Sequence, residues 1–243
     1  GARSLAPGSY YYVVKMNGAA IGFARSRFDT LATGFVFEDN IILDVPAMDT
    51  SHRAIAVTRI EMGPSLQLKN FSFDLTSEIG RFNVVGAMRA DSMLDLELRA
   101  GGNTQKSTVK ADPGLLLDAA VPMRLAAGNQ MEVGRTFVTR VFDPSTMSER
   151  DSELEITARD TMFLPDSAKW DPQRNVFVAS RYDTIPVFRV EQRFGTITVG
   201  NWFDEDGHLV KAESPLGFTL ERTAFELADQ EWKSSVGTRA YAA

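Results

Sequence analysis

Acidic residues gather in one short segment whose spacing could serve a metal ion. Asp204 and Asp206 precede Gly207, which resembles the start of a calcium-binding loop. Such a loop carries oxygen ligands at its first, third and fifth positions, then glycine, and a glutamate further on. Here Trp202 occupies the first position. We therefore predict a hairpin turn and no metal site, because Asp and Gly are also favoured turn residues.

A nucleophilic triad is the second chemistry that the residue types suggest. Asp49, Ser51 and His52 lie close together in the sequence. Adjacent residues of an extended strand point to opposite faces, so this spacing does not bring the three side chains together. The chain also lacks a G-x-S-x-G segment, which presents the nucleophile in many hydrolases. We predict a surface segment and no catalytic residue.

Paired carboxylates, which glycosidases use as acid and base, also occur. Glu153 and Glu155 alternate with Leu154 and Ile156, and charged residues alternate in the same way over 189–193. This period of two is typical of a half-buried strand whose charged side chains face solvent. We predict a solvated face, and a carboxylate- or serine-dependent hydrolase is the least favoured function.

The composition excludes several kinds of protein. The chain has 243 residues, a net charge of −6, two histidines and no cysteine. Thiol nucleophiles, disulfides and thiolate or multi-histidine metal sites are therefore excluded, and we expect no cofactor. Nucleic acid is not an expected partner, since proteins that bind it usually carry a basic face.

The chain contains no apolar run that approaches the ~20 residues of a membrane-spanning helix. It begins with Gly1 rather than methionine. We expect that a signal peptide has been removed and that no transmembrane segment is present.

The dominant pattern is that of strands joined by tight turns. Asn17-Gly18, Gly101-Gly102 and Asp206-Gly207 each separate two runs of strand-forming residues, which is a strong hairpin signal. Later strands are expected over 153–160, 175–180 and 187–194. We predict a mainly β fold with a minor α component: a single curved antiparallel sheet, or half-barrel, with a short helical segment on its concave face. The domain spans 10–233, between flexible tails at 1–9 and 234–243.

One segment, Pro113–Ala127, has a helical rather than a strand pattern. Proline near its start and Gly128 after its end are typical helix boundaries, and Pro122 predicts one or two short pieces rather than one long helix. Its apolar residues surround the helix and should pack inside the concave sheet. They either fill the core or form a lid over a hydrophobic groove. The candidate groove or lid residues are Leu115, Leu116, Val121, Met123 and Leu125.

Five segments resemble the β-rich N-terminal domain found ahead of transglutaminase-like domains in exported bacterial proteins. They are Tyr12–Gly22, Glu132–Phe137, Val141–Thr146, Asn201–Lys211 and Leu216–Ala224. That domain is in turn similar to LolA/LolB-like lipoprotein-carrier half-barrels. The resemblance implies a periplasmic or exported location. A transglutaminase-like catalytic domain requires a cysteine, which this chain lacks.

Two main functions follow from this resemblance. The first is a non-enzymatic periplasmic or cell-surface module that binds an acyl chain, a lipoprotein, another hydrophobic ligand or a partner protein domain. The second is an accessory structural domain that normally precedes a transglutaminase-like catalytic domain, which is absent here. An open apolar cavity of several hundred Å³ would favour ligand binding, and a filled core would favour the accessory role.

Overall fold

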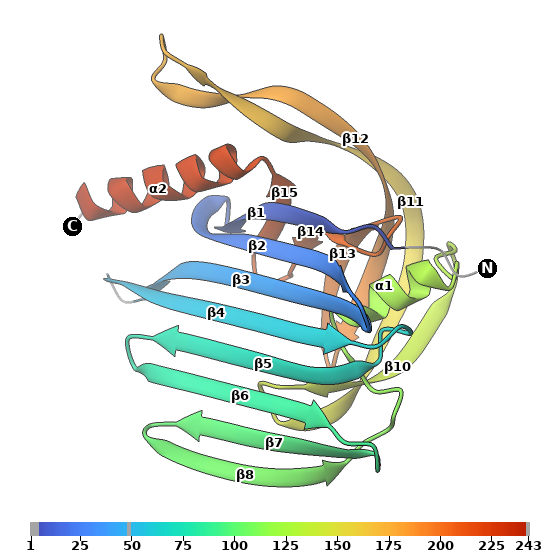
Figure 1. Ribbon diagram of the computed structural model, residues 1–243. Helices are drawn as coiled ribbons and strands as arrows, with labels where there is room; N and C mark the ends of the chain where they lie inside the picture. Colours follow the sequence, from blue (N-terminus) through green and yellow to red (C-terminus); the bar gives the residue numbers. More distant parts are fainter. Residues whose placement is uncertain (1–4, 48–49, 242–243) are drawn as a thin grey trace.

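The computed structural model describes residues 5–47 and 50–241. Every strand in these ranges belongs to one sheet, which curls around a short helix (Figure 1). The strand order is β8-β7-β6-β5-β4-β3-β2-β1-β15-β14-β13-β12-β11-β10-β9. Consecutive strands therefore pair with each other except β8 and β9, which form the two edges of the sheet, and β15 returns to pair with β1. The pairs are antiparallel except that of β9 with β10. The predicted fold class, a curved antiparallel half-barrel, is confirmed.

The elements have the following bounds. The strands are β1 (Gly8–Met16), β2 (Ala19–Leu31), β3 (Gly34–Ala47), β4 (Thr50–Met62), β5 (Leu68–Ser77), β6 (Gly80–Met88), β7 (Met93–Ala100), β8 (Asn103–Lys110), β9 (Leu116–Leu117), β10 (Thr136–Asp143), β11 (Ser148–Asp171), β12 (Val176–Phe194), β13 (Ile197–Asp204), β14 (Leu209–Glu213) and β15 (Phe218–Thr223). The helices are α1 (Ala120–Ala127) and α2 (Phe225–Tyr241).

The tight turns lie where the sequence predicts them. Asn17 and Gly18 connect β1 to β2 with φ values of 49° and 83°, and Gly101 and Gly102 connect β7 to β8 with φ values of 56° and 78°. Two successive residues with positive φ match the right-handed twist of the flanking strands. These turns therefore favour the β1–β2 and β7–β8 hairpins.

The concave face of the sheet carries the main hydrophobic cluster. Helix α1 lies inside the curl, near the end of the sheet at which β1 begins (Figure 1). Buried side chains from α1 and β9 pack there against Phe28, Ile60 and Phe71 from the first half of the chain and Ile156 and Val190 from the second. This contact between distant strands holds the curl closed around α1.

The segment 113–127 forms one helical piece and one short strand. The helix begins only at Ala120, and Leu116 and Leu117 instead pair in parallel with Val141 and Phe142 of β10. Pro122 lies in the first turn of α1, where its missing N–H costs no intrahelical hydrogen bond. The proline therefore sets where the helix begins rather than breaking it.

Helix α2 packs on the opposite, convex face of the sheet. Ala228 is fully buried against Val13 and Ala20, and Phe225 packs edge-on against Tyr11 and Phe23. The helix continues to Tyr241, so much of the expected tail 234–243 is helical; residues 242–243 lie outside the described part.

The expected N-terminal tail, 1–9, is also shorter than predicted. Strand β1 begins at Gly8, and Leu5 is only 4% exposed within the main cluster. Residues 1–4 lie outside the described part of the chain.

A long two-stranded arm replaces the separate strands expected over 153–160, 175–180 and 187–194. Strands β11 and β12 stay paired from Glu153 and Arg193 to Asp171 and Val176, and the arm rises beyond the rest of the sheet (Figure 1). Register shifts near Ile156 and Pro165 absorb the irregular residues that interrupt the strand pattern in the sequence.

Candidate functional site

A cavity of about 370 Å³ lies between α1 and the concave faces of β1–β3 and β12–β14. Aromatic rings form much of its wall, and a small set of polar side chains faces into it. The polar and charged lining residues are Tyr10, Tyr12, Ser26, Asp39, Asp118, Gln192, Asn201 and His208. Ligand pockets are typically apolar hollows of ~300–1,000 Å³ with a few placed polar groups, so this cavity is the candidate site.

Strands β2 and β3 supply one wall of the cavity. In the antiparallel register Phe28 opposes Phe37, and Ser26 opposes Asp39, so these four side chains share the concave face. The Ser26 hydroxyl donates a hydrogen bond to Asp39 Oδ1 at 2.9 Å. The register thus places one carboxyl group in an otherwise apolar wall.

Burial changes the acidity of this carboxyl group. Removal from bulk water raises the pKa of Asp39 to about 6, although the Ser26 hydroxyl and the Asn40 backbone favour the ionised form. A neutral carboxylic acid is less costly to bury than a carboxylate, which explains the direction. Asp39 has no ion-pair partner among the described residues.

The opposite wall carries a connected polar network. Gln192 Nε2 donates to both carboxylate oxygens of Asp118 at 2.9 Å, and the Ser152 hydroxyl donates to Asp118 Oδ1 at 2.8 Å. Asn201 Nδ2 donates to Gln192 Oε1 at 3.1 Å, and Arg150 lies 3.7 Å from Asp118. This network satisfies the Asp118 carboxylate and ties the start of α1 to β11–β13.

The β13–β14 turn closes the cavity against α1. Gly207 has a φ of 80°, and a Cβ atom there would lie 2.5 Å from backbone atoms of Pro122 and Met123. Asp204, predicted as a turn residue, accepts backbone hydrogen bonds from Asp206 at 3.0 Å and His208 at 2.9 Å. Its carboxylate stabilises the turn, and glycine permits the turn to contact the helix directly.

His208 follows this turn and lines the cavity. The side chain is 4% exposed, and its Nε2 atom has no hydrogen-bond partner among the described residues. Desolvation lowers the pKa of His208, so the imidazole is neutral near pH 7. A buried ring nitrogen without a partner is uncommon in folded proteins, so His208 Nε2 can accept a hydrogen bond from a group that enters the cavity.

Two tyrosines complete the polar lining. Tyr12 donates its hydroxyl proton to the Leu209 carbonyl at 2.6 Å, and burial raises the pKa of the phenol well above its usual range. The Arg222 guanidinium stacks on the Tyr10 ring at 3.9 Å and pairs with Asp204 at 3.1 Å. Both phenols therefore remain neutral near pH 7. Arg222 lies behind Tyr10 and does not line the cavity.

The five residues singled out in the sequence are all buried in the main cluster. They are Leu115, Leu116, Val121, Met123 and Leu125. Met123 also lines the cavity, and the other four do not. Whether this segment moves as a lid stays a prediction.

The other residues considered for catalysis lie on the surface. His52 contacts Glu78 through Nδ1 at 2.5 Å and Thr50 through Nε2 at 3.1 Å, and all three side chains are exposed. Asp49 lies outside the described residues. Glu153 pairs with Arg193 at 3.4 Å on the solvated face of the arm's base. Within 5–47 and 50–241, no group of three or more His, Asp or Glu side chains is arranged to hold a metal ion.

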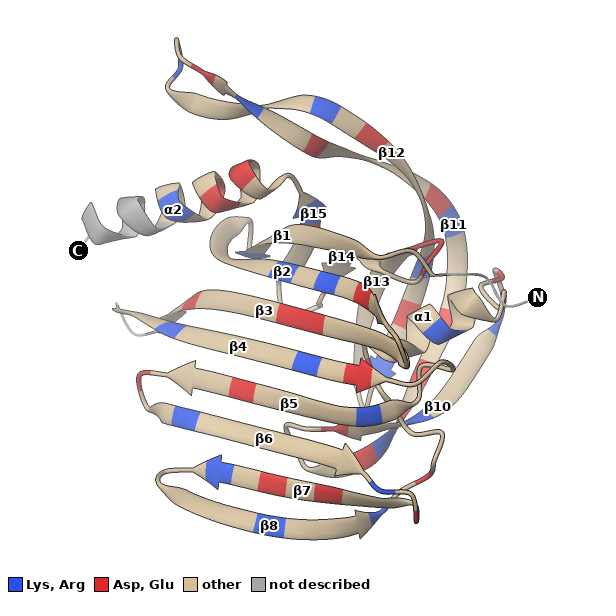
Figure 2. Ribbon diagram, in the orientation of Figure 1, with Lys and Arg blue, Asp and Glu red and all other residues tan. Residues whose placement is uncertain are grey.

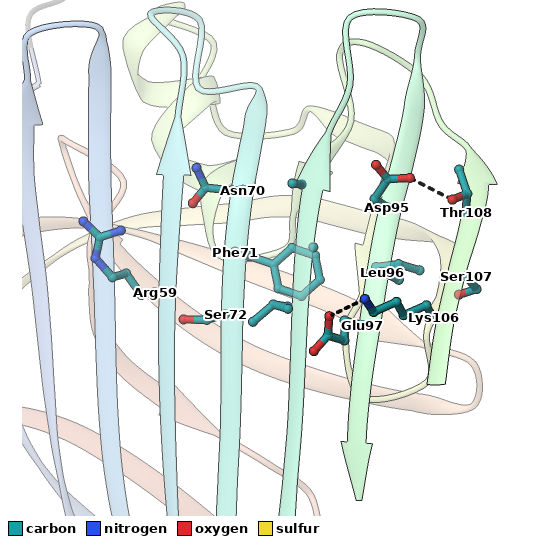
Figure 3. A pocket seen from close by; sticks show the side chains of 13 residues that line it. Arg59, Asn70, Phe71, Ser72, Asp95, Leu96, Glu97, Lys106, Ser107 and Thr108 are labelled. Atoms are coloured by element: carbon teal, nitrogen blue, oxygen red, sulfur yellow. Dashed lines mark hydrogen bonds and ion pairs between the residues drawn. The ribbon is translucent and has the colours of Figure 1, made fainter. Parts of the chain in front are cut away.

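A larger but different hollow, of about 600 Å³, lies across β4–β8. Figure 3 shows Arg59, Glu97, Lys106 and Thr108 standing on these strands. Lys106 pairs with Glu97 at 3.8 Å, and Thr108 donates to Asp95 at 2.7 Å. Its charged side chains therefore already have partners along the strands, and the cavity beside α1 is the better candidate.

Sequence reasoning missed Asp39, Asp118, Gln192 and His208 as a group. A signal existed for Asp39: it interrupts the otherwise apolar alternation of residues 35, 37, 41 and 43. No comparable signal marks Gln192, which lies 74 positions from Asp118 in the sequence.

Comparison with known proteins identifies the fold. No known family profile matches the chain, and no curated protein matches it. The solved structure of a beta-barrel-like protein of the domain of unknown function DUF1849, from Brucella abortus, has a TM-score of 0.61 and 12% sequence identity. The match covers 92% of this chain and 97% of that one. The curled sheet is therefore a known barrel-like architecture.

A DUF1089 family protein from Pseudomonas aeruginosa is also similar. Its TM-score is 0.42 at 11% identity, over 79% of this chain and 89% of that one. Neither comparison identifies a ligand. Among the described residues, neither helix combines the length and apolar character needed to cross a membrane.

Proposed function

We propose that this protein is a non-enzymatic binding module of the periplasm or cell surface that holds a small, largely apolar ligand in the cavity beside α1. The observation that carries the proposal is the cavity of about 370 Å³ on the concave face, with aromatic walls and few polar groups. The sequence resemblance to a domain similar to lipoprotein-carrier half-barrels favours an acyl chain or the lipid part of a lipoprotein as the ligand class.

The apolar surface also continues beyond the cavity. Past Asp39, the next concave-facing residues of β3 are Ile41 and Leu43, which pack against a second cluster around Tyr12 and Val14. These side chains are half-buried, as are Phe218 and Leu220 beside them. A ligand longer than the cavity could extend along this surface and bury more apolar area.

The accessory function remains the second candidate. The dense cluster around α1 favours it, because much of the concave face is already filled by the protein's own side chains. In that case the domain would precede a transglutaminase-like catalytic domain and bind no small ligand. The two functions differ in whether the cavity is used.

Fluorescence titration with phenylnaphthylamine, an uncharged probe that brightens in apolar sites, tests the proposal. We expect saturable binding to the wild type and its loss in Ser26→Leu, whose larger side chain enters the cavity. Arg25→Leu is the matched control, because Arg25 neighbours Ser26 on β2 but points to the convex, exposed side. Thermal unfolding of each variant would show that it is folded.

Two results would contradict the binding function. One is the absence of saturable binding to the folded wild type, which would favour the accessory role. The other is equal binding by Ser26→Leu and Arg25→Leu, which would place the ligand elsewhere.

A further inference from the structure

Asp39 is the feature of the cavity that folding alone does not explain. It lies in a row of concave-facing residues of β3, between Phe37 on one side and Ile41 on the other. Its side chain receives one side-chain hydrogen bond, from Ser26, and no cation pairs with it within the described residues. Asp39 is half-buried, and partial removal of a carboxylate from water without a counter-ion is costly, so a residue of this kind usually has a task.

The second acid of the cavity provides an internal contrast. Asp118 accepts hydrogen bonds from Gln192 and Ser152 and lies near Arg150. Its negative charge is therefore balanced by the protein. Asp39 lacks an equivalent set of partners, which leaves its charge available to a bound molecule.

The aromatic walls around Asp39 also favour a ligand group with a positive charge. Phe28, Phe37 and Phe203 line the cavity together with Tyr12. The faces of aromatic rings attract cations, most strongly where water is excluded. The lining residues include two aspartates and neither lysine nor arginine. The nearby Arg150 and Arg222 are paired with Asp118 and Asp204, so the lining itself offers an anionic group no positive charge.

An independent observation shows that the cavity has unused hydrogen-bonding capacity. His208 Nε2 is buried and unpartnered, and the ring lies 5.1 Å from the Phe28 ring, centroid to centroid. A neutral imidazole offers one donor and one acceptor nitrogen. A polar ligand group could therefore contact His208 as well as Asp39.

We propose that the cavity selects an organic ammonium: a ligand whose apolar body lies against the aromatic walls and whose cationic nitrogen pairs with the Asp39 carboxylate. This inference rests on the proposed binding function and specifies the ligand's polar end. A charge-assisted N–H···O hydrogen bond to Asp39 would be stronger than one between neutral groups. The same site would disfavour a fatty acid carboxylate of equal length.

The affinity should depend on pH through Asp39. Its pKa is raised to about 6, so the carboxyl group loses its charge, and the ammonium its partner, as the pH falls below that value. Protonation of His208 at lower pH would act in the same direction by adding a positive charge. The other ionisable groups around the cavity are Tyr10, Tyr12, Asp118, Arg150, Asp204, Asp206 and Arg222.

Competition among three eight-carbon ligands tests this inference. Octylamine, octanol and octanoate share one apolar body, and each is titrated against bound phenylnaphthylamine, with calorimetry as a direct check. We expect octylamine to bind at least about tenfold more tightly than octanol near pH 7.5, and octanoate to bind most weakly. The ratio of octylamine to octanol affinity should fall towards one near about pH 5.

Asp39→Asn keeps the shape of the side chain and removes its charge. We expect the octylamine preference to disappear in this variant at every pH. Glu38→Gln is the matched control, because Glu38 precedes Asp39 on β3 and faces the opposite side, where it pairs with Arg27 and Arg59. It should retain the wild-type preference.

The outcomes separate the two proposals. If octanol and the probe bind but octylamine has no advantage, or if octanoate binds best, the ammonium inference is wrong and the binding function stands. If the preference persists in Asp39→Asn, Asp39 is not its source and the inference is overturned. If calorimetry and fluorescence detect no binding of any of these compounds, both proposals fail.

Discussion

The two faces of strand β3 handle their acidic residues differently. On the convex face Glu38 pairs with Arg27 at 3.4 Å and Arg59 at 3.3 Å, and Asp44 pairs with Arg53 at 2.9 Å. On the concave face Asp39 accepts hydrogen bonds from the Ser26 hydroxyl and the Asn40 backbone, and no cation among the described residues pairs with it. One strand therefore carries acids whose ion-pair partners the fold supplies and one acid whose ion-pair partner it does not.

Many other charged residues of the sheet follow the first pattern, such as Arg140 with Glu149 and Arg193 with Glu153. Figure 2 shows acidic and basic positions mixed along neighbouring strands, with neither sign gathered in one area. Cross-strand pairs of opposite charge explain such an arrangement without any ligand. The contrast teaches that a charged residue becomes informative about function when the register gives it no partner.

The largest expected effect comes from a charge forced into the apolar part of the concave side. Leu116 is 1% exposed within the main cluster, so Leu116→Asp would bury an unpaired carboxylate and lose apolar contacts. We expect a loss of at least about 4 kcal/mol in the free energy of unfolding, measured by urea denaturation.

Leu216→Asp is the control for this substitution, because Leu216 is 67% exposed. It should change stability by no more than about 0.5 kcal/mol. Similar stabilities for the two variants would mean that β9 does not lie under the curl.

The sequence predicted those features of the fold that depend on residues close together in the chain. The Asn17-Gly18 turn, the strand alternation and the apolar character of 113–127 are all properties of neighbouring residues. Pairing over longer distances was less accessible: Pro165 and Pro186 interrupt the strand pattern of the arm, yet the two strands stay paired across both positions. Only the partner strand and the register shifts make the arm continuous.

The candidate site could not be predicted from the sequence for the same reason, since it depends on which distant strands become neighbours. The alternation around Asp39 places it among apolar residues, but the sequence does not show whether Lys or Arg from another strand faces it. Closure of the sheet decides this, since β1 pairs with β15 and brings Arg222 close to Tyr10 while leaving it bound to Asp204. An unpaired acid can be recognised only after every neighbouring strand is placed.

The next effect in size concerns the convex face. Asp44 is buried, and its carboxylate accepts hydrogen bonds from Arg53 and from Trp232 Nε1 of α2 at 3.0 Å. Asp44→Ala should cost about 2–3 kcal/mol, because it leaves the indole N–H unpaired and removes the anchor of α2. Thermal denaturation would measure the loss, and faster amide hydrogen exchange in α2 would show that the anchor is released. An unchanged exchange rate would contradict this role.

Substitution of Asp39, on the concave face, should raise the stability of the protein rather than lower it. The folded state raises the Asp39 pKa from 3.8 to about 6, so the folded protein binds a proton more tightly than the unfolded chain does. This contribution to stability is complete below about pH 4 and is lost as the pH rises through about 6.

Asp39→Asn should therefore be more stable than the wild type at pH 7 and differ little from it near pH 4. At ~1.4 kcal/mol per pKa unit the gain has an upper limit near ~3 kcal/mol, and water in the cavity reduces it to about 1–2 kcal/mol. Urea denaturation of both proteins across this pH range measures the difference. A destabilised Asp39→Asn at pH 7 would mean that the ionised carboxylate has a partner that supports the fold.

The smallest effect is expected one residue away, at Glu38. Its side chain is about one-third exposed and lies between two arginines that are more exposed still, so solvent screens each attraction. Glu38→Gln keeps the side-chain length and should lower stability by about 0.5 kcal/mol or less, as urea denaturation near pH 7 would show. The sign matters more than the size: removing a negative charge weakens the convex face and strengthens the concave face of the same strand. If Glu38→Gln were instead to stabilise the protein as Asp39→Asn should, relief of the overall negative charge would explain both results, and Asp39 would no longer stand apart.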